Sequence, residues 1–338
     1  MPWSEVECHP RVRKALQRSI EKGMLQTTHL LYGPEGAGQN ALARAVAMTL
    51  SCQNQTGDFC GMCKNCRRIQ ARAYPDVFEL YPWEDWSDPK RKGRDFGIDH
   101  MREVQKVAAV QPYEGEYKVF IVHHAHRMTE EAANCLLKTL EEPNQFSLFL
   151  LLTENVNAIL PTILSRCRRI RLMPLPLEEL VERLGEELEP EQAQTIALAA
   201  HGLPERAREL LQEGFLEERD YVLDVLRQVR TSLSAPMEVV DPLVKDKDKI
   251  TGRLVILQEL LRDALLAVEL NEPVTYYNPD KKEEIARLWK GVKPELLIQG
   301  IENIWSILDS MELNVNPTLL FSDLLIGLSM AGRRDVKR

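Results

Sequence analysis

The sequence predicts an α/β domain with a parallel sheet covered by helices on both faces, followed by segments that are entirely helical. Up to residue 172, short and nearly continuous apolar runs alternate with segments of helical periodicity, the pattern of a parallel sheet buried on both faces. With 338 residues, the chain is also too long for one ordinary core. Five runs are predicted to be strands: His29–Tyr32, Val77–Leu80, Lys118–His123, Ser147–Thr153 and Arg169–Leu172.

The strand pattern ends at Met173-Pro174-Leu175-Pro176, and the rest of the chain is predicted to be helical. Apolar residues recur at helical spacing from Ile256 to Val268 and from Leu297 to Leu308. Residues 232–249 are expected to be less ordered, because they carry prolines and alternating Lys and Asp. The chain therefore divides into three predicted domains, at residues 1–172, 173–214 and 215–338.

Composition and charge exclude several classes of protein. Hydrophobic residues make up 44% of the chain and charged residues 28%, as in soluble globular proteins. No apolar run approaches the roughly 18 residues of a membrane span, and the first residues lack the layout of a signal peptide. A net charge of −8 argues against a protein that coats nucleic acid unaided. We expect a cytoplasmic protein without membrane contact, whose seven cysteines favour a metal site over disulfides.

A glycine-rich loop follows the first predicted strand and precedes a helix. Its sequence, GPEGAGQN, fits the phosphate-binding frame G-x-x-x-x-G-K-[ST] except at the last two positions. Gly33, Gly36 and Gly38 would let backbone N–H groups converge on a phosphate at the helix N-terminus. Gln39 and Asn40 replace the lysine that carries charge to the phosphates and the hydroxyl that binds magnesium. The loop is a nucleotide site that has lost its catalytic groups or a mere tight turn, and ATP binding is left open.

The third predicted strand ends without the carboxylates that ATP hydrolysis requires. A strand in this position would end in an acidic pair, with Asp holding magnesium and Glu polarising the attacking water. His123 and His124 stand there instead, and imidazoles are poor ligands for a hard cation. Together with Gln39 and Asn40, these residues predict that the chain has no ATPase activity of its own. A transition-metal site at His124 and His126 is a weaker alternative, since the sequence offers the pair no nearby carboxylate or thiolate.

Four cysteines form the most specific metal signal in the chain. Cys52, Cys60, Cys63 and Cys66 have two-residue spacers between the last three, which suits tetrahedral zinc. Four sulfur ligands leave no open coordination position, so the predicted role of zinc is structural. Chelation of this kind contributes on the order of 10 kcal/mol to folding in zinc-finger peptides.

The order of these motifs resembles the bacterial clamp-loader AAA+ subunits. The glycine-rich loop and the cysteines are followed by LLKTLEEP (residues 136–143) and SRC (residues 165–167). NVNPTLLFSDLL (residues 314–325) and Leu261-Arg262-Asp263 are similar to that family's C-terminal collar. The similarity covers essentially the whole chain. It implies an AAA+ domain with a zinc module at residues 52–66, then a helical lid domain and an all-α collar domain that oligomerises.

The resemblance also implies a role in a ring that loads the sliding clamp onto primed DNA. The family contains an ATP-hydrolysing tau/gamma motor and a stator that does not hydrolyse ATP, and the substituted loop resembles the stator. The implied partners are the tau/gamma and delta subunits, the sliding clamp, and primed DNA through the assembly. Each ATP site in the ring is completed by an arginine of the adjacent subunit, which the SRC motif assigns here to Arg166.

Other features of the family, such as its sensor residues, are matched less completely by this sequence. Thr153 and Asn155 lie where the family places a γ-phosphate sensor. Arg206 lies near the sensor arginine of active relatives but one residue out of register, so it is not assigned that role. Residues 83–96 are longer and more charged than the family suggests, and we interpret them as a surface loop.

Two other functions stay open at this point. One is an ATP-hydrolysing motor of the tau/gamma type with unusual ligands, including His123, His124 and His126. The other is a zinc-dependent nucleic-acid-binding module, although the acidic balance and the lack of a basic, aromatic-rich surface around the cysteines count against it. The family is named for a DNA polymerase, but we expect no polymerase activity in this chain.

Overall fold

The fold is described from a computed structural model, which covers residues 3–54, 57–84, 94–232, 234–269, 275–311 and 316–330. The chain forms two compact units. The first contains Met1–Pro176 and Gly202–Arg206, and the second contains Leu177–His201 and Ala207–Arg338. Most of the charged segment expected at residues 83–96 lies outside the described residues. The division into three domains with boundaries at residues 172 and 214 stays a prediction.

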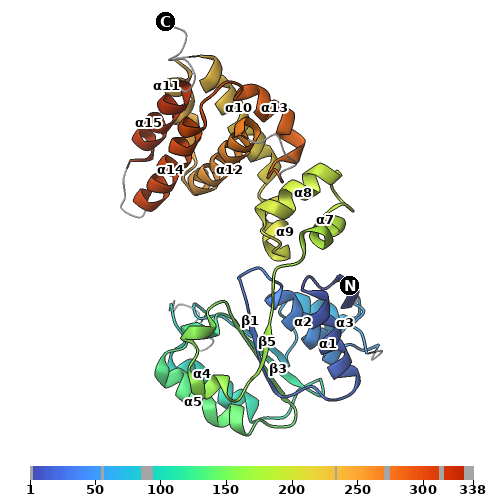
Figure 1. The fold of residues 1–338 in the computed structure, drawn as a ribbon. Coiled ribbons are helices and arrows are strands. Elements are labelled where there is room, and N and C mark those ends of the chain that lie inside the picture. Colours follow the sequence, from blue (N-terminus) through green and yellow to red (C-terminus); the bar gives the residue numbers. More distant parts are fainter. Residues whose placement is uncertain are drawn as a thin grey trace, which may run out of the picture. The chain divides into compact units, whose positions relative to one another are not determined.

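The first unit contains a five-stranded parallel sheet, which confirms the predicted fold class of this region. All residues of β3 and β4 are buried, which explains why their sequences are nearly continuous apolar runs. β1 lies between β4 and β5, and β5 forms an outer edge of the sheet. The strands, in the spatial order β2-β3-β4-β1-β5 (Figure 1), are β1 (Thr28–Tyr32), β2 (Val77–Leu80), β3 (Lys118–Val122), β4 (Ser147–Thr153) and β5 (Arg168–Arg171).

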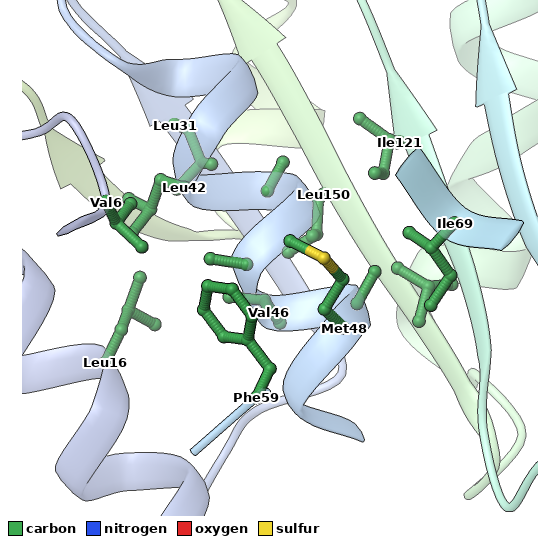
Figure 2. Close-up of a cluster of buried hydrophobic side chains, with 14 of the residues drawn as sticks. Val6, Leu16, Leu31, Leu42, Val46, Met48, Phe59, Ile69, Ile121 and Leu150 are labelled. Carbon is green, nitrogen blue, oxygen red and sulfur yellow. The ribbon is translucent and has the colours of Figure 1, made fainter. Parts of the chain in front are cut away.

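Helices cover both faces of this sheet, as the apolar strands predict. Ile121 and Leu150 pack with Val46 in the core on one face (Figure 2). On the other face Phe120 stacks on Phe149, with ring centroids 4.8 Å apart. Alternate residues of one strand thus supply two separate cores. The first face carries α1 (Pro10–Glu21), α2 (Gln39–Ser51) and α3 (Lys64–Gln70), and the second carries α4 (Ile98–Ala108) and α5 (Glu130–Glu141). Shorter elements are η1 (Trp3–Glu5), η2 (Ala125–Arg127), η3 (Val156–Ala158) and α6 (Pro161–Leu164).

The second unit is helical in all the elements that the structure describes, as predicted (Figure 1). No helix in the described part of the chain is both long and apolar enough to span a bilayer. The helices are α7 (Leu177–Leu184), α8 (Pro190–Ala199), α9 (Pro204–Gln212), α10 (Phe215–Thr231), α11 (Ala235–Lys245), α12 (Ile250–Glu269), α13 (Lys282–Leu288), α14 (Pro294–Met311) and α15 (Pro317–Met330), with short turns η4 (Lys247–Lys249) and η5 (Pro279–Lys281). The start of α9, up to Arg206, belongs to the first unit.

The expectation of a less ordered stretch at residues 232–249 is wrong. Helix α11 occupies most of it and buries Val239, Val240 and Leu243. Pro236 lies in the first turn, where its missing N–H leaves no helical bond unmade. The buried apolar side chains therefore outweigh the local helix-breaking signal of Pro242 inside the helix.

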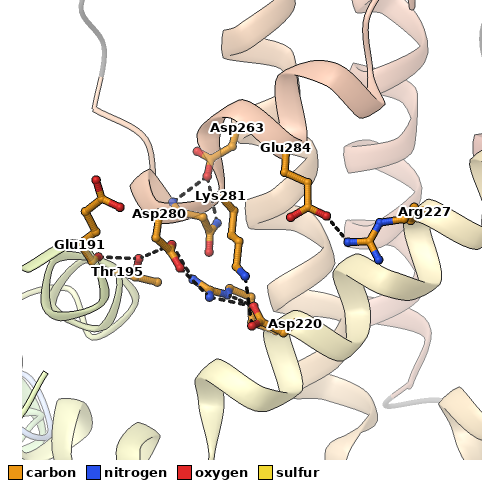
Figure 3. A network of polar contacts seen from close by, with 10 residues as sticks. Glu191, Thr195, Asp220, Arg227, Asp263, Asp280, Lys281 and Glu284 are labelled. Carbon is orange, nitrogen blue, oxygen red and sulfur yellow. Dashed lines mark hydrogen bonds and ion pairs between the residues drawn. The ribbon is translucent and has the colours of Figure 1, made fainter. Parts of the chain in front are cut away.

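A buried ion pair joins three elements of the second unit (Figure 3). Arg219 on α10 is only 1% exposed, and its two Nη atoms each donate to a carboxylate oxygen of Asp280 at 2.8 Å. Thr195 on α8 donates its hydroxyl hydrogen to the same carboxylate, at 3.2 Å. The Asp280 carboxylate on η5 thus links α8 to α10. The link is strong because a buried guanidinium needs its bidentate partner.

Candidate functional site

The glycine-rich loop joins β1 to α2 at the C-terminal edge of the sheet. Gly36 and Gly38 have φ angles of +80° and +94°, which glycine adopts without strain. A Cβ atom at Gly38 would lie 1.9 Å from the carbonyl oxygen of Glu7, and one at Gly33 would lie 2.3 Å from that of Leu172. Close approach of neighbouring backbone therefore requires glycine at these positions.

The side chain of Gln39 is folded back onto the loop. Its Nε2 atom donates to the carbonyl oxygens of Gly33 at 3.0 Å and Pro34 at 2.8 Å, and the residue is 6% exposed. A lysine at this place in a phosphate-binding loop extends toward the β- and γ-phosphates. Gln39 instead bridges the two ends of the loop and brings no positive charge.

A carboxylate from later in the chain lies at the N-terminus of α2. Glu205 accepts hydrogen bonds from the backbone N–H of Ala41 at 3.3 Å and from Nδ2 of Asn40 at 3.2 Å, and its own N–H donates to the Gly36 carbonyl. A helix N-terminus attracts anions because its first N–H groups have no helical partner. The carboxylate thus takes a place suited to a phosphate. No sequence motif singles out Glu205, although its unassigned neighbour Arg206, which is exposed, lies in the same segment.

His123, at the end of β3, lies beside a buried carboxylate. Its Nε2 atom is 3.6 Å from Glu79 Oε2, and its ring stacks on Tyr81 with centroids 4.1 Å apart. Arg44 on α2 donates to both oxygens of Glu79, at 2.8 and 2.9 Å, and Arg72 Nε lies 3.1 Å from it. Burial alone would raise the pKa of Glu79, but the proximity of His123 and the hydrogen bonds from Arg44 lower it to about 2.

Burial also lowers the pKa of His123, which favours the neutral ring. The position predicted for a magnesium ligand thus holds a neutral imidazole against an ion pair. Glu79 and Arg44 could not be identified from the sequence, because no local motif signals a pairing across 35 residues.

His124 and His126 share a second carboxylate. Nδ1 of His124 is 3.0 Å and Nε2 of His126 is 3.4 Å from Oε1 of Glu154. Nδ1 of His126 also lies 3.2 Å from the hydroxyl of Thr153, which accepts from the Asn155 N–H at 3.1 Å. The two residues expected at a sensor position are therefore bonded within the chain. Among the described residues, three or more metal-binding atoms converge only at the four cysteines, so the structure gives the alternative of a metal at the histidines no support.

A cavity of about 100 Å³ lies between the loop and the histidines. Its lining includes Gly36, Gln39, His123, His124 and Glu154. Pockets that bury a drug-sized ligand usually measure roughly 300–1,000 Å³. The structure therefore brings the predicted loop and strand-end residues together around one small cavity.

The four predicted cysteine ligands lie together at the end of α2 and around the start of α3. Their sulfur atoms are all within 4.8 Å of one another, and Cys52 Sγ is 3.7 Å from Cys60 Sγ and 4.0 Å from Cys63 Sγ. Zn–S bonds of about 2.3 Å in a tetrahedron place the sulfurs about 3.8 Å apart. The backbone N–H of Cys66 donates to Cys63 Sγ at 3.4 Å, as suits a metal-bound thiolate. The residues present therefore fit a zinc ion.

Arg166 lies at the opposite edge of the sheet from the glycine-rich loop. It precedes β5, whose first residue pairs with the first half of β1, whereas the loop follows the last residue of β1. Its Nε donates to Glu141 at 2.7 Å and its Nη1 to the Thr162 carbonyl at 2.8 Å, and 32% of the side chain is exposed. The chain therefore does not bring Arg166 to its own loop, but presents it at the surface.

Comparison with known proteins identifies the family. A family model described as "DNA polymerase III, delta subunit" matches residues 8–176, and one for its C-terminal part matches residues 213–329. A DNA polymerase III subunit delta' of Bacillus subtilis (strain 168) is 32% identical over 67% of this chain and 68% of its own. The subunit delta' of Haemophilus influenzae is 34% identical over 74% of each chain.

A DNA polymerase III subunit tau of Bacillus subtilis is also similar, at 27% identity over 82% of this chain and 49% of the relative. The matches to subunit delta' are higher in identity and extend over more than two thirds of those relatives. The chain therefore belongs to the delta-prime subunit family of DNA polymerase III.

Proposed function

We propose that the chain is a non-hydrolysing stator subunit of a replicative clamp loader. In an assembly with tau/gamma and delta subunits, it would support the loading of a sliding clamp onto primed DNA in the cytoplasm. The family membership and the likeness to a tau subunit support the assembly. The observation that carries the non-hydrolysing role is the internal bonding of the loop, by Gln39 on one side and Glu205 on the other.

The loop and its surroundings would neither bind nor hydrolyse ATP. A triphosphate brings about four negative charges, and this site already holds the carboxylates of Glu79, Glu154 and Glu205. Gln39 stands at the lysine position of the loop and carries no positive charge to offset that of the triphosphate. The side chain of Arg44, the nearest cation on α2, is already occupied by Glu79. An ATP-hydrolysing motor, the alternative function, would have to break these bonds before it could bind nucleotide.

Arg166 would act in the ATP site of a neighbouring motor subunit. Its exposure and its place away from the chain's own loop support a role in trans. Glu141 would position the guanidinium until the neighbour's γ-phosphate competes for it. An arginine finger of this kind accounts for roughly 10³ to 10⁵ in rate.

The four cysteines would hold a structural zinc ion. The ion would cross-link the end of α2, the loop after it and the first turn of α3. Trp3 packs against this module: its backbone N–H donates to Asp58 at 2.9 Å, and its ring meets Phe59 edge-on, with centroids 6.2 Å apart. Zinc would therefore fix the N-terminal residues as well as the module.

The test is DNA-stimulated ATPase activity of the loader reconstituted with tau/gamma and delta subunits. Arg166→Ala is expected to lower the rate at least about 10²-fold while the complex still assembles, because the charge on the transferred phosphate is no longer offset. Arg18→Ala, on the exposed surface of α1, serves as the control and should leave the rate unchanged. An unchanged rate with Arg166→Ala would remove the arginine finger from the proposal. ATP turnover that depends on this chain's own loop would instead establish the motor alternative.

A further inference from the structure

A groove of about 260 Å³ lies between α1 and β5, at the edge of the sheet. Val12 and Leu16 of α1 and Ile170 of β5 give it an apolar lining. Both elements belong to the first unit, so the groove does not depend on the placement of the second. It is separate from the loop, from the cysteines and from Arg166, none of which lines it.

Four arginines line this groove without a counterion. They are Arg11 of α1 and Arg168, Arg169 and Arg171 of β5. Arg68, elsewhere in the same unit, is paired with Glu114. The four arginines of the groove, by contrast, form no ion pair with any acidic residue in the described part of the chain. Four like charges around one groove repel one another, and an anionic occupant would relieve that repulsion.

The groove is bordered by an open strand edge. β5 pairs with β1 on one side, and no strand among the described residues pairs with its other side. An edge strand offers N–H and C=O groups to an added strand. Positive charges on such an edge keep a second copy of the same strand away. The occupant that fits is therefore a strand of opposite charge.

We propose that this groove binds an extended acidic segment of a partner protein, which adds to the sheet beside β5. Acidic side chains of the segment would meet the arginines, and the apolar side chains that alternate with them would lie against Val12, Leu16 and Ile170. Nucleic acid fits less well, because the groove has no aromatic side chain for base stacking and part of its lining is apolar. This proposal is independent of the proposed function, since no part of the nucleotide loop enters it.

The test uses the full chain and a fluorescent eight-residue peptide that alternates glutamate and valine. Anisotropy should show saturable binding with a dissociation constant below about 1 mM. Arg169→Gln with Arg171→Gln should weaken binding at least about tenfold, through loss of two ion pairs next to the added strand. The control, Lys14→Gln with Arg18→Gln, removes the same charge from exposed positions of α1 outside the groove and should change binding less than about twofold.

Two further probes separate strand addition from simple charge attraction. A peptide of equal charge with proline at a central valine cannot pair along its length and should bind at least about tenfold more weakly. Backbone amides of β5 should gain protection from hydrogen exchange only with the unmodified peptide. Absence of saturable binding, equal weakening in both double variants, or equal binding of the proline peptide would each overturn the proposal. So would a single-stranded oligonucleotide that displaces the peptide and depends on the same two arginines.

Discussion

At the scale of single residues, the loop region is defined by carboxylates that lie far from it in sequence. Glu205 is 164 residues from the amide of Ala41 that it caps, and Glu79 is 35 residues from Arg44. Gln39 and Asn40 could be singled out from the sequence because the phosphate-loop frame fixes what those positions should hold. Their actual partners could not, because hydrogen bonds between distant segments leave no periodic signal.

Glu205 should prevent nucleotide binding even after the loop is repaired. We expect the double variant Gln39→Lys with Asn40→Thr to bind a fluorescent ADP poorly, because the carboxylate still occupies the N-terminus of α2. Adding Glu205→Gln should raise the affinity at least about tenfold, since a charge that repels phosphate is removed. Fluorescence titration of the two variants measures the difference. Equal affinities would mean that Glu205 does not compete with phosphate.

Glu79 should stabilise the fold in a pH-dependent manner. Its pKa is about 2 in the folded chain and has an ordinary value of 4.5, so its contribution is fully present above about pH 4.5 and is lost as the pH falls toward 2. At neutral pH, Glu79→Gln should lower the free energy of unfolding by on the order of 3 kcal/mol. Urea unfolding at several pH values should show this difference shrinking below pH 4.5.

The control for that measurement is Glu84→Gln. Glu84 also faces Arg72, at 3.8 Å, but its side chain is 47% exposed. The Glu84→Gln substitution should therefore lower the free energy of unfolding by less than about 1 kcal/mol at any pH. If both variants lose the same stability, burial is not what makes the Glu79 pairs strong.

At the scale of elements, the apolar runs of the strands predicted the sheet because both of its faces are covered. All five predicted runs overlap observed strands within one or two residues. Helix α11 was not predicted, because its prolines and alternating charges indicate an irregular segment and the sequence alone does not show which of its side chains are buried. Its buried face depends on other helices of the second unit, and those contacts appear only in the tertiary structure.

The cysteine module is the element whose stability should depend on a ligand. We expect one zinc ion per chain, and its removal by a chelator should lower the melting temperature and release protection in residues 57–70. Cys63→Ser should lower the zinc content and the melting temperature, because three sulfurs hold zinc less tightly than four. Cys135→Ser, outside the cluster, should leave the zinc content unchanged. Elemental analysis together with thermal unfolding checks both, and a metal-free protein of unchanged stability would contradict a structural role.

At the scale of the whole molecule, the two compact units do not coincide with a simple division of the chain. Residues 202–206 return to the first unit after α7 and α8 have joined the second. This return is what brings Glu205 to the loop. A unit built from two separated segments has no single boundary along the sequence.

The ion pair between Arg219 and Asp280 should hold the second unit together. Asp280→Asn removes the bidentate partner of a buried guanidinium and leaves it only Asp220, whose side chain is 48% exposed, and we expect the free energy of unfolding of that unit to fall by about 3 kcal/mol. Asp224→Asn removes a carboxylate that is 50% exposed from its pair with Arg227 and should cost less than about 1 kcal/mol. Hydrogen exchange can localise the effect. Equal losses in the two variants, or a loss spread over the sheet, would contradict this assignment.

The sequence by itself determined the parallel sheet, the helical remainder and the four clustered cysteines. Each of these is encoded locally, by the alternation of apolar runs, by helical spacing or by ligands within 15 residues. Only the tertiary structure decided that the phosphate-type loop is bonded to Glu205, that Arg166 lies at the opposite edge of the sheet, and that unpaired arginines gather in one groove. These features arise where burial of apolar side chains brings distant segments together. The apolar pattern of the sequence predicts that burial, but it does not say which polar side chains will then meet.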